Sequence, residues 1–299
     1  MTSHSIYKTK QGEKVLLDIY DRQLAELEVE YDMFNVDTRF GYTNVLAAGS
    51  KEKEKLIIFH GGNSTNPYNL KFFLPLLKKF QIYAPDTIGH PGYSSQKTLS
   101  SKDHSYGQWA FDLISGLNIK KANCVGISYG GGILIRLAAY RPGIIKKAAF
   151  VVPSGIANCS LLQLMVKLGL PMIKYRLLPG RENLISAIEP MTNSKEIDKG
   201  TLEMVEAVFK HVKVKTEMPR NATKKELENF LAPTLVIAAE NDLLFPGQTV
   251  IKRAKEIFPN LIKAELLNKS PHLFFQSKED VEKVNNVIED FFINLPLQR

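Results

Sequence analysis

Hydrophobic and polar positions follow two different periods along the chain, and the change comes near residue 55. Between residues 13 and 28, hydrophobic side chains recur at helical spacing with charged residues between them. This pattern predicts an amphipathic helix. Two strand-like runs follow, 29–36 and 42–47, with turn-forming residues at 37–41 between them. Two such runs joined by a short turn predict a β-hairpin.

From residue 55 onward, short apolar runs alternate with helical patterns. Strands that are apolar throughout need cover on both faces, and their alternation with helices favours right-handed crossovers. The sequence therefore predicts an α/β fold with a mostly parallel, doubly wound sheet. The predicted strands are 56–59, 82–84, 122–127, 148–152, 234–239 and 262–267, and the predicted helices are 68–80, 106–117, 130–140, 249–258 and 280–293.

A long helical segment, residues 156–230, interrupts this alternation. Its apolar side chains recur at helical spacing, and Pro171, Pro179 and Pro190 punctuate it. Because the segment leaves the carboxyl end of a strand, we expect several helices to form a cap over that edge of the sheet. The expected organisation is a core of residues 1–155 and 231–299, which includes the helix 13–28, and a cap of residues 156–230.

A candidate nucleophile lies between a predicted strand and a predicted helix. Residues 126–130 fit the pattern G-x-S-x-G around Ser128. This five-residue pattern alone is weak evidence for a nucleophile. Its position between the strand 122–127 and the helix 130–140 makes it the strand–turn–helix of a nucleophile elbow. Small flanking residues suit a sharp turn in which side chains would collide. The alternative is an incidental serine in a glycine-rich turn.

Candidate oxyanion donors follow the strand 56–59. The run His60-Gly61-Gly62-Asn63 carries a glycine pair, which lets the backbone approach an oxyanion and direct N–H groups at it. We expect one donor to be the N–H of Tyr129 and the other to be that of Gly62 or Asn63. His60 precedes the turn and is expected to order it. A tight turn without function is the alternative.

A candidate acid and a candidate base follow the last two predicted strands. Asp242 lies in the loop beyond the strand 234–239, while Glu240, nearer the strand, is the alternative acid. His272 follows the strand 262–267. Both loops leave the carboxyl edge of the sheet, where Ser128 is also expected. A histidine is more often a packing residue, but this placement predicts a base.

These motifs resemble those of the α/β-hydrolase superfamily, and within it the capped serine hydrolases related to carboxylesterases. The run 86–94 is similar to the family's D-x-x-G-H-G-x-S loop with Pro91 inserted, and Pro271 stands where the family has glycine before its catalytic histidine. The resemblance implies an α/β-hydrolase fold and a catalytic triad in the family's chain order. The triad residues are Ser128, Asp242 and His272.

The resemblance also implies hydrolysis of a small carboxylic ester through an acyl-serine, without a cofactor. Relatives with aspartate at the elbow, the haloalkane dehalogenases and epoxide hydrolases, are excluded by Ser128. A small-ligand receptor with slow turnover, or another acyl or carbon–carbon hydrolase, stays open. We expect an apolar acyl pocket whose walls include a face of the cap, with Leu161 and Leu162. The tentative substrate-binding residues are Met165, Leu168, Phe245 and Phe274.

The composition of the chain indicates which classes of partner are not expected. The net charge is +8, but the lysines come in scattered pairs rather than one stripe, so no nucleic-acid partner is expected. The two cysteines show no ligand spacing, so no metal is expected. The first 14 residues are polar and no run of about 18 apolar residues occurs, so we expect a cytoplasmic protein without a membrane partner. A small-molecule ester is the expected ligand; no protein partner is assigned.

Overall fold

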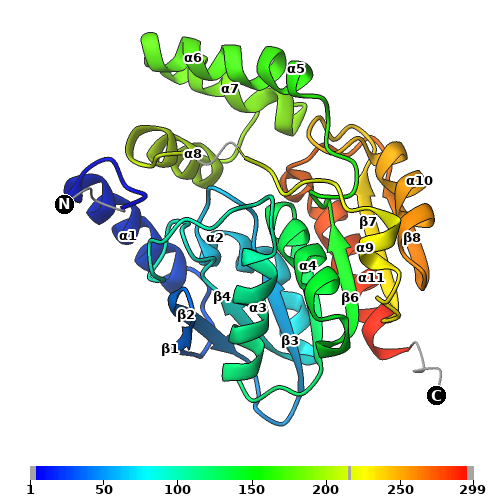
Figure 1. Ribbon diagram of the computed structural model, residues 1–299. Helices are drawn as coiled ribbons and strands as arrows, with labels where there is room; N and C mark the ends of the chain where they lie inside the picture. Colours follow the sequence, from blue (N-terminus) through cyan, green and yellow to red (C-terminus); the bar gives the residue numbers. More distant parts are fainter. Residues whose placement is uncertain (1–4, 215–216, 295–299) are drawn as a thin grey trace.

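The computed structural model describes residues 5–214 and 217–294. An eight-stranded sheet lies at its centre, with the strand order β1-β2-β4-β3-β5-β6-β7-β8 (Figure 1). The strands are β1 (Tyr31–Thr38), β2 (Gly41–Ala48), β3 (Glu54–Phe59), β4 (Phe80–Pro85), β5 (Ala122–Ile127), β6 (Ile145–Val151), β7 (Thr234–Ala239) and β8 (Leu261–Leu267). The first two form the predicted hairpin, and β2 also pairs antiparallel with β4. All pairs among β3 to β8 are parallel, which confirms a mostly parallel α/β sheet.

Helices cover both faces of this sheet. The helices of the core are α1 (Lys10–Ala25), α2 (Asn66–Leu70), α3 (Ser105–Gly116), α4 (Tyr129–Tyr140), α10 (Gly247–Ile257) and α11 (Lys278–Ile293), with the 3-10 helices η1 (Lys71–Lys78), η2 (Pro142–Ile144) and η4 (Phe274–Gln276). The predicted helix 68–80 is thus divided into α2 and η1. Pro75 lies inside η1 and has no amide hydrogen to donate to an α-helical turn. Helix α1 begins three residues before its predicted start because Thr9 caps it through the amide of Gly12.

The hydrophobic core lies in two layers, one on each face of the sheet. Cys124 belongs to the layer under α3, α4 and α10, whereas its neighbour Val125 belongs to the layer under α1, η1 and α11. Successive residues of a strand point to opposite faces, so a strand covered on both sides has no polar face. All six residues of β5 are buried, which places the end of this strand firmly in the core.

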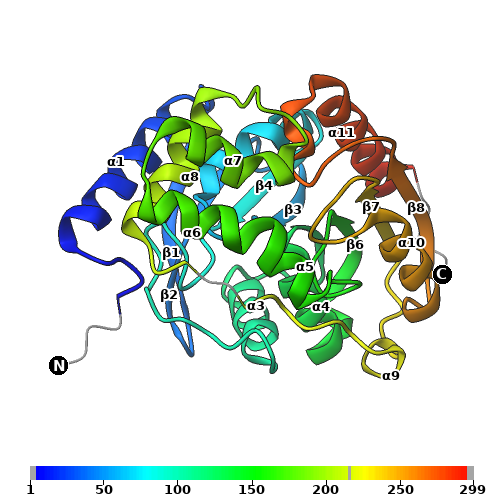
Figure 2. The ribbon, with the colours of Figure 1, turned by 90° about the horizontal axis from the view of Figure 1, so that it is seen from above.

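Residues 156–230 leave the core after β6 and return before β7. They form α5 (Leu161–Leu164), the π-helix η3 (Met165–Gly169), α6 (Leu170–Leu177), α7 (Arg181–Thr192), α8 (Lys199–His211) and α9 (Lys224–Leu227). Figure 1 shows α5, α6 and α7 as a layer beyond the carboxyl ends of the strands, with α8 nearer the core and beside α1. Seen from above, these helices lie across the sheet (Figure 2). Within the described ranges, no helix has both the length and the apolar character needed to cross a bilayer.

Candidate active site

Ser128 occupies a strained turn between β5 and α4. Its φ of +50° and ψ of −114° lie where a side chain is rarely tolerated. The turn is possible because its neighbours are small. A Cβ atom added to Gly130 would lie 2.1 Å from the carbonyl oxygen of Phe59, so glycine allows α4 to pack directly on β3. The strain presents the Ser128 side chain, half-buried, at the carboxyl edge of the sheet.

The end of β6 and the loop that follows it hold this turn in place. The amide of Ser128 donates to the carbonyl of Val151 at 2.9 Å. The carbonyl of Ser128 accepts from both the amide and the hydroxyl of Ser154, at 3.0 and 3.1 Å. Sequence reasoning missed Ser154, because its part depends on β5 and β6 being neighbours in the sheet and no local pattern marks it.

Ser128, His272 and Asp242 form a continuous hydrogen-bonded chain. His272 Nε2 lies 3.0 Å from Ser128 Oγ, and His272 Nδ1 lies 2.7 Å from Asp242 Oδ2. The other carboxylate oxygen of Asp242 accepts from the amides of Leu244 and Phe245 at 2.7 and 3.0 Å. The aspartate and the histidine are both buried. With Nδ1 directed at a carboxylate, the imidazole presents Nε2 to the serine.

The loops after β7 and β8 are linked to each other, which brings acid and histidine together. The amide of Asn241 donates to the carbonyl of Ser270 at 2.9 Å. Glu240, the alternative acid, is exposed and accepts from the amide of Lys269 at 2.7 Å. Both nitrogens of His272 are already engaged by other residues, so Glu240 has no place at the imidazole.

His60 anchors the loop after β3 as a neutral side chain. Its Nε2 accepts from the amide of Thr87 at 2.9 Å, and its Nδ1 donates to the carbonyl of Gly61 at 2.7 Å. Burial lowers the pKa of His60 to about 4, against an opposing effect of the bond to Gly61. One ring nitrogen donates and the other accepts, an arrangement that only the neutral imidazole can make.

The same loop lies directly against the turn after β5. The amide of Gly61 donates to Asn69 Oδ1 at 3.2 Å, and Asn69 in turn donates to the Ser64 hydroxyl at 2.7 Å. A Cβ atom on Gly62 would lie 3.0 Å from the Cβ of Tyr129, which shows how closely the two segments approach. Asn63 has a φ of +51°. Sequence reasoning missed Asn69, which lies within a helical pattern and meets Gly61 only in the folded chain.

The four tentative substrate-binding residues fall in different surroundings. The Phe245 ring lies 5.3 Å from the His272 ring, edge to face, and Leu168 shares a buried cluster with Phe245 and Tyr129. Phe274 is buried in the layer on the other face of the sheet. Met165 is 51% exposed. Leu161 and Leu162, expected on the same face of the segment, are each 74% exposed and turn toward solvent.

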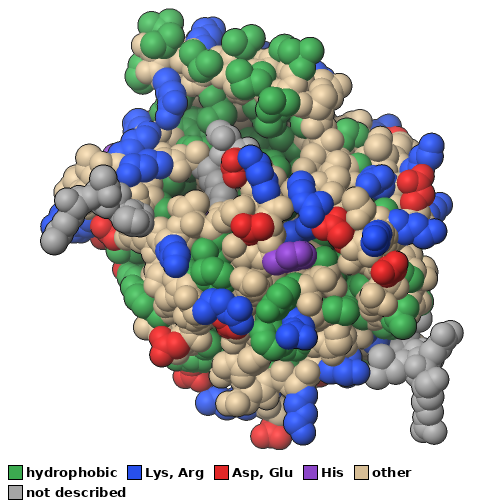
Figure 3. Space-filling model, viewed as in Figure 1, with side chains coloured by type: hydrophobic (Ala, Val, Ile, Leu, Met, Phe, Trp, Pro, Cys, Tyr) green, Lys and Arg blue, Asp and Glu red, His purple; other side chains and the backbone are tan. Residues whose placement is uncertain are grey.

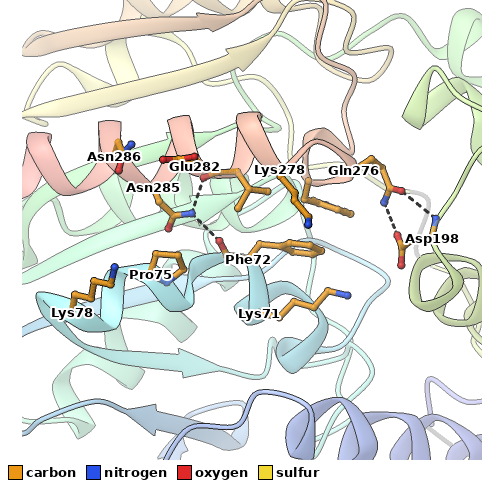
Figure 4. Close-up of a pocket in the computed structure, with 12 residues that line it drawn as sticks. Lys71, Phe72, Pro75, Lys78, Asp198, Gln276, Lys278, Glu282, Asn285 and Asn286 are labelled. Carbon is orange, nitrogen blue, oxygen red and sulfur yellow. Dashed lines mark hydrogen bonds between the residues drawn. The ribbon is translucent and has the colours of Figure 1, made fainter.

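A separate pocket of about 570 Å³ lies between η1 and α11 (Figure 4). The Phe72 and Phe275 rings stack there at 4.3 Å, and Asn285 donates to the carbonyl of Phe72 at 2.8 Å. None of the candidate site residues lines this pocket, so it is distinct from the Ser128 site. In the part of the chain that the structure describes, no cluster of three or more His, Cys, Asp or Glu is placed to hold a metal ion.

Comparisons with known proteins relate this chain to a family and to solved structures of the same fold. A family model described as "alpha/beta hydrolase fold" matches residues 55–172, a stretch that includes the loop after β3 and Ser128. The chain is 25% identical over 281 residues to carboxylesterase YbfK of Bacillus subtilis, covering 91% of each chain. It is 24% identical to a second B. subtilis protein, an uncharacterized carboxylesterase, covering 91% and 90%. The crystal structure of naproxen esterase from B. subtilis superposes with a TM-score of 0.81 at 20% identity, covering 95% of this chain and 99% of that one.

Proposed function

Because this chain is an α/β hydrolase related to carboxylesterases, we propose that it hydrolyses a small carboxylic ester through an acyl-serine intermediate. The observation that carries the proposal is the chain of hydrogen bonds from Ser128 Oγ through His272 to Asp242. A serine paired with a base that a carboxylate orients is the arrangement that activates a hydroxyl for attack on an acyl carbon. The relatives named as carboxylesterases support the same bond type.

In the proposed reaction, Ser128 Oγ attacks the ester carbonyl while His272 Nε2 accepts the hydroxyl proton. His272 then donates this proton to the leaving alcohol, and Ser128 carries the acyl group. In the second half, His272 takes a proton from water, which attacks the acyl carbon and releases the acid. Asp242 keeps Nδ1 protonated and stabilises the positive imidazolium in both halves. Protons and bonds balance without a cofactor.

The negative charge on the carbonyl oxygen develops beside the turn after β5. We assign one oxyanion donor to the amide of Tyr129 and the other to the amide of Gly62 or Asn63. The close approach of Gly62 to Tyr129 supports this pairing, as does the engagement of the Gly61 amide by Asn69. Helix α4 begins at Tyr129, so its partial positive charge lies at the same place.

The segment 156–230 is proposed as a cap, because α5 to α8 lie beyond the strand ends where Ser128 projects (Figure 1). Leu168 and Phe245, which share a buried cluster with Tyr129, are proposed to contact the acyl group, with Met165 and Phe274 as further candidates. An apolar wall of this kind favours an uncharged acyl chain. The partner that we propose is a small-molecule ester, and the location that we propose is cytoplasmic.

The test of the triad uses an activated ester such as p-nitrophenyl butyrate. Ser128→Ala should lower kcat by at least about 10³-fold, since triad residues act as one unit. Asp242→Asn should cause a comparable loss because it removes the carboxylate that orients His272. The matched controls are Ser186→Ala and Glu240→Gln, on exposed residues, which should keep nearly full activity. A Ser128→Ala enzyme that retains most of its activity would contradict the assignment.

The same assay separates an enzyme from a receptor. An esterase should release one equivalent of p-nitrophenol rapidly where deacylation is slow, and should then continue to turn over. A ligand receptor built on this fold would stop after about one turnover. A single turnover by the unmodified protein, with no later release, would therefore overturn the proposed function while leaving the acyl-serine chemistry in place.

A further inference from the structure

The outer side of α5, η3 and α6 carries hydrophobic side chains that face solvent. Leu162, Val166, Leu170, Ile173 and Leu177 follow one another at intervals of three or four residues, which places them on one face of the helical segment. They are between 46% and 75% exposed. We call these five residues the outer face.

The opposite side of the same segment is also apolar, and it is buried. Leu168 packs in the core cluster with Tyr129, and Tyr175 packs with Leu184 of α7. A surface helix of a globular protein ordinarily has one apolar side, turned to the core, and one polar side. Here the inner side already satisfies the packing of the segment, so packing within the chain does not account for the outer face. A contiguous exposed apolar patch of this kind is typical of an interaction surface.

The charge of the segment indicates which kind of partner the outer face would bind. Residues 160–181 contain Lys167, Lys174, Arg176 and Arg181 and no Asp or Glu. All four cations are exposed, and none of them forms an ion pair within the part of the chain that the structure describes. Figure 3 shows hydrophobic side chains along this edge of the molecule with basic ones among them. Leucines flanked by Lys and Arg form the pattern of helices that lie in the plane of a membrane surface.

We propose that the outer face docks this protein on the surface of a bilayer that contains anionic lipid. The apolar side chains would enter the boundary between headgroups and acyl chains, and the four cations would meet the phosphate groups. The expectation of no membrane partner depended on the lack of a spanning segment. A face that lies on the surface needs none.

A second copy of the chain fits this face less well. In a symmetric dimer the same patch of both subunits meets, which would bring the unpaired cations of two segments together without an acidic residue from either. Like charges in an apolar interface are unfavourable. An anionic lipid surface offers the opposite charge over the whole area.

The test measures co-sedimentation with vesicles of phosphatidylcholine alone and with about 30% phosphatidylglycerol. Wild type and Ser128→Ala should bind equally, so binding is scored independently of the proposed hydrolysis. The partition coefficient should be at least about fivefold higher on the anionic vesicles and should fall as salt rises. Binding that is absent from both vesicles, or equal on both, would overturn the proposal.

Two variants separate the apolar and the ionic contributions. The partition coefficient should fall at least about tenfold in a variant that combines Leu170→Ser, Ile173→Ser and Leu177→Ser. It should fall as far in a variant that combines Lys167→Glu, Lys174→Glu and Arg176→Glu. All six positions are exposed, and retained turnover of a soluble ester checks the fold.

Matched controls carry the same changes elsewhere on the surface. Met33→Ser with Phe34→Ser, at two exposed positions of β1, should bind within about twofold of wild type. So should the combination of Lys120→Glu, Lys121→Glu and Lys255→Glu. An equal loss in the controls would show that overall charge or hydrophobicity, and not the outer face, governs binding. A wild-type dimer in sedimentation velocity that the triple serine variant dissociates would identify the face as a contact between copies and would also overturn the proposal.

Discussion

His60 is fully buried next to the candidate oxyanion loop, and its two ring nitrogens have opposite hydrogen-bonding roles. The contact with Thr87 does not survive protonation, because the protonated ring has no acceptor for the Thr87 amide. The pKa of His60 in the folded chain is about 4, below the ordinary value near 6.5 in an unfolded chain. Between these two values, the unfolded state binds a proton that the folded state does not. Acidification through this window therefore destabilises the fold.

The substitution His60→Gln isolates this effect, because glutamine can also donate and accept but does not titrate. At pH 7 the variant should be less stable than wild type. At pH 4.5 the cost of the substitution should be smaller by about 2 kcal/mol, since wild type alone loses stability to protonation of this histidine. Urea unfolding at the two pH values measures the difference, and His104→Gln, at an exposed position, is the control. If His60→Gln lowered the free energy of unfolding equally at both pH values, the pKa of His60 could not be lowered in the folded chain.

At the scale of elements, the contact between β3 and α4 depends on the lack of a side chain at Gly130. Helix propensity alone favours alanine over glycine by about 1 kcal/mol. The contribution of packing to stability favours glycine, because the added Cβ would lie 2.1 Å from the Phe59 oxygen. This oxygen is a backbone atom that cannot move without displacing β3. Packing therefore decides the outcome here.

We expect Gly130→Ala to lower the free energy of unfolding by at least about 3 kcal/mol, or to prevent folding. Gly143→Ala is the matched control, because nothing lies within 4 Å of its added Cβ, and it should change stability by no more than about 0.5 kcal/mol. Thermal or urea unfolding of both variants makes the comparison. If Gly130→Ala were as stable as wild type, β3 and α4 could not approach each other as described.

At the scale of the whole molecule, a cap over the strand ends would limit the length of acyl chain that fits. Each methylene that enters an apolar pocket contributes about 0.8 kcal/mol until the pocket is full. For p-nitrophenyl esters, kcat/KM should therefore rise several-fold from acetyl to butyryl or hexanoyl and then decline for longer chains. A value of kcat/KM that does not depend on acyl length, or a requirement for a charged acyl group, would contradict the apolar pocket.

Leu168→Ala should move this optimum toward longer chains, because it would enlarge the acyl pocket that Leu168 is proposed to line. Met165→Ala is the comparison within the same helical segment. Its side chain is 51% exposed, so its loss should shift the optimum less. Equal shifts in both variants would place the pocket wall elsewhere on the segment.

The local pattern of the sequence determined the elements and their order. The bounds of β5 and β7 agree with the predicted strands, because a strand buried on both faces is marked by a short apolar run between polar turns. Ser128, Asp242 and His272 could be proposed together because each lies at or shortly beyond the end of a predicted strand, and parallel strands bring their carboxyl ends to one edge. The 3-10 turn of η1 around Pro75 does not follow from the sequence pattern, because the hydrophobic period of residues 68–80 is also that of an α-helix.

The contacts between side chains that are distant in sequence could be found only from the tertiary structure. Ser154 and Asn69 hold the turn of Ser128 and the loop of Gly61 through contacts between segments that are distant in sequence, so no spacing marks them. The segment around α5 and α6 is apolar on two sides, and hydrophobic period alone cannot say which side is buried. In the folded chain Leu168 is buried against the core and Leu162 is exposed, because only the inner side of the segment packs against the core and α7.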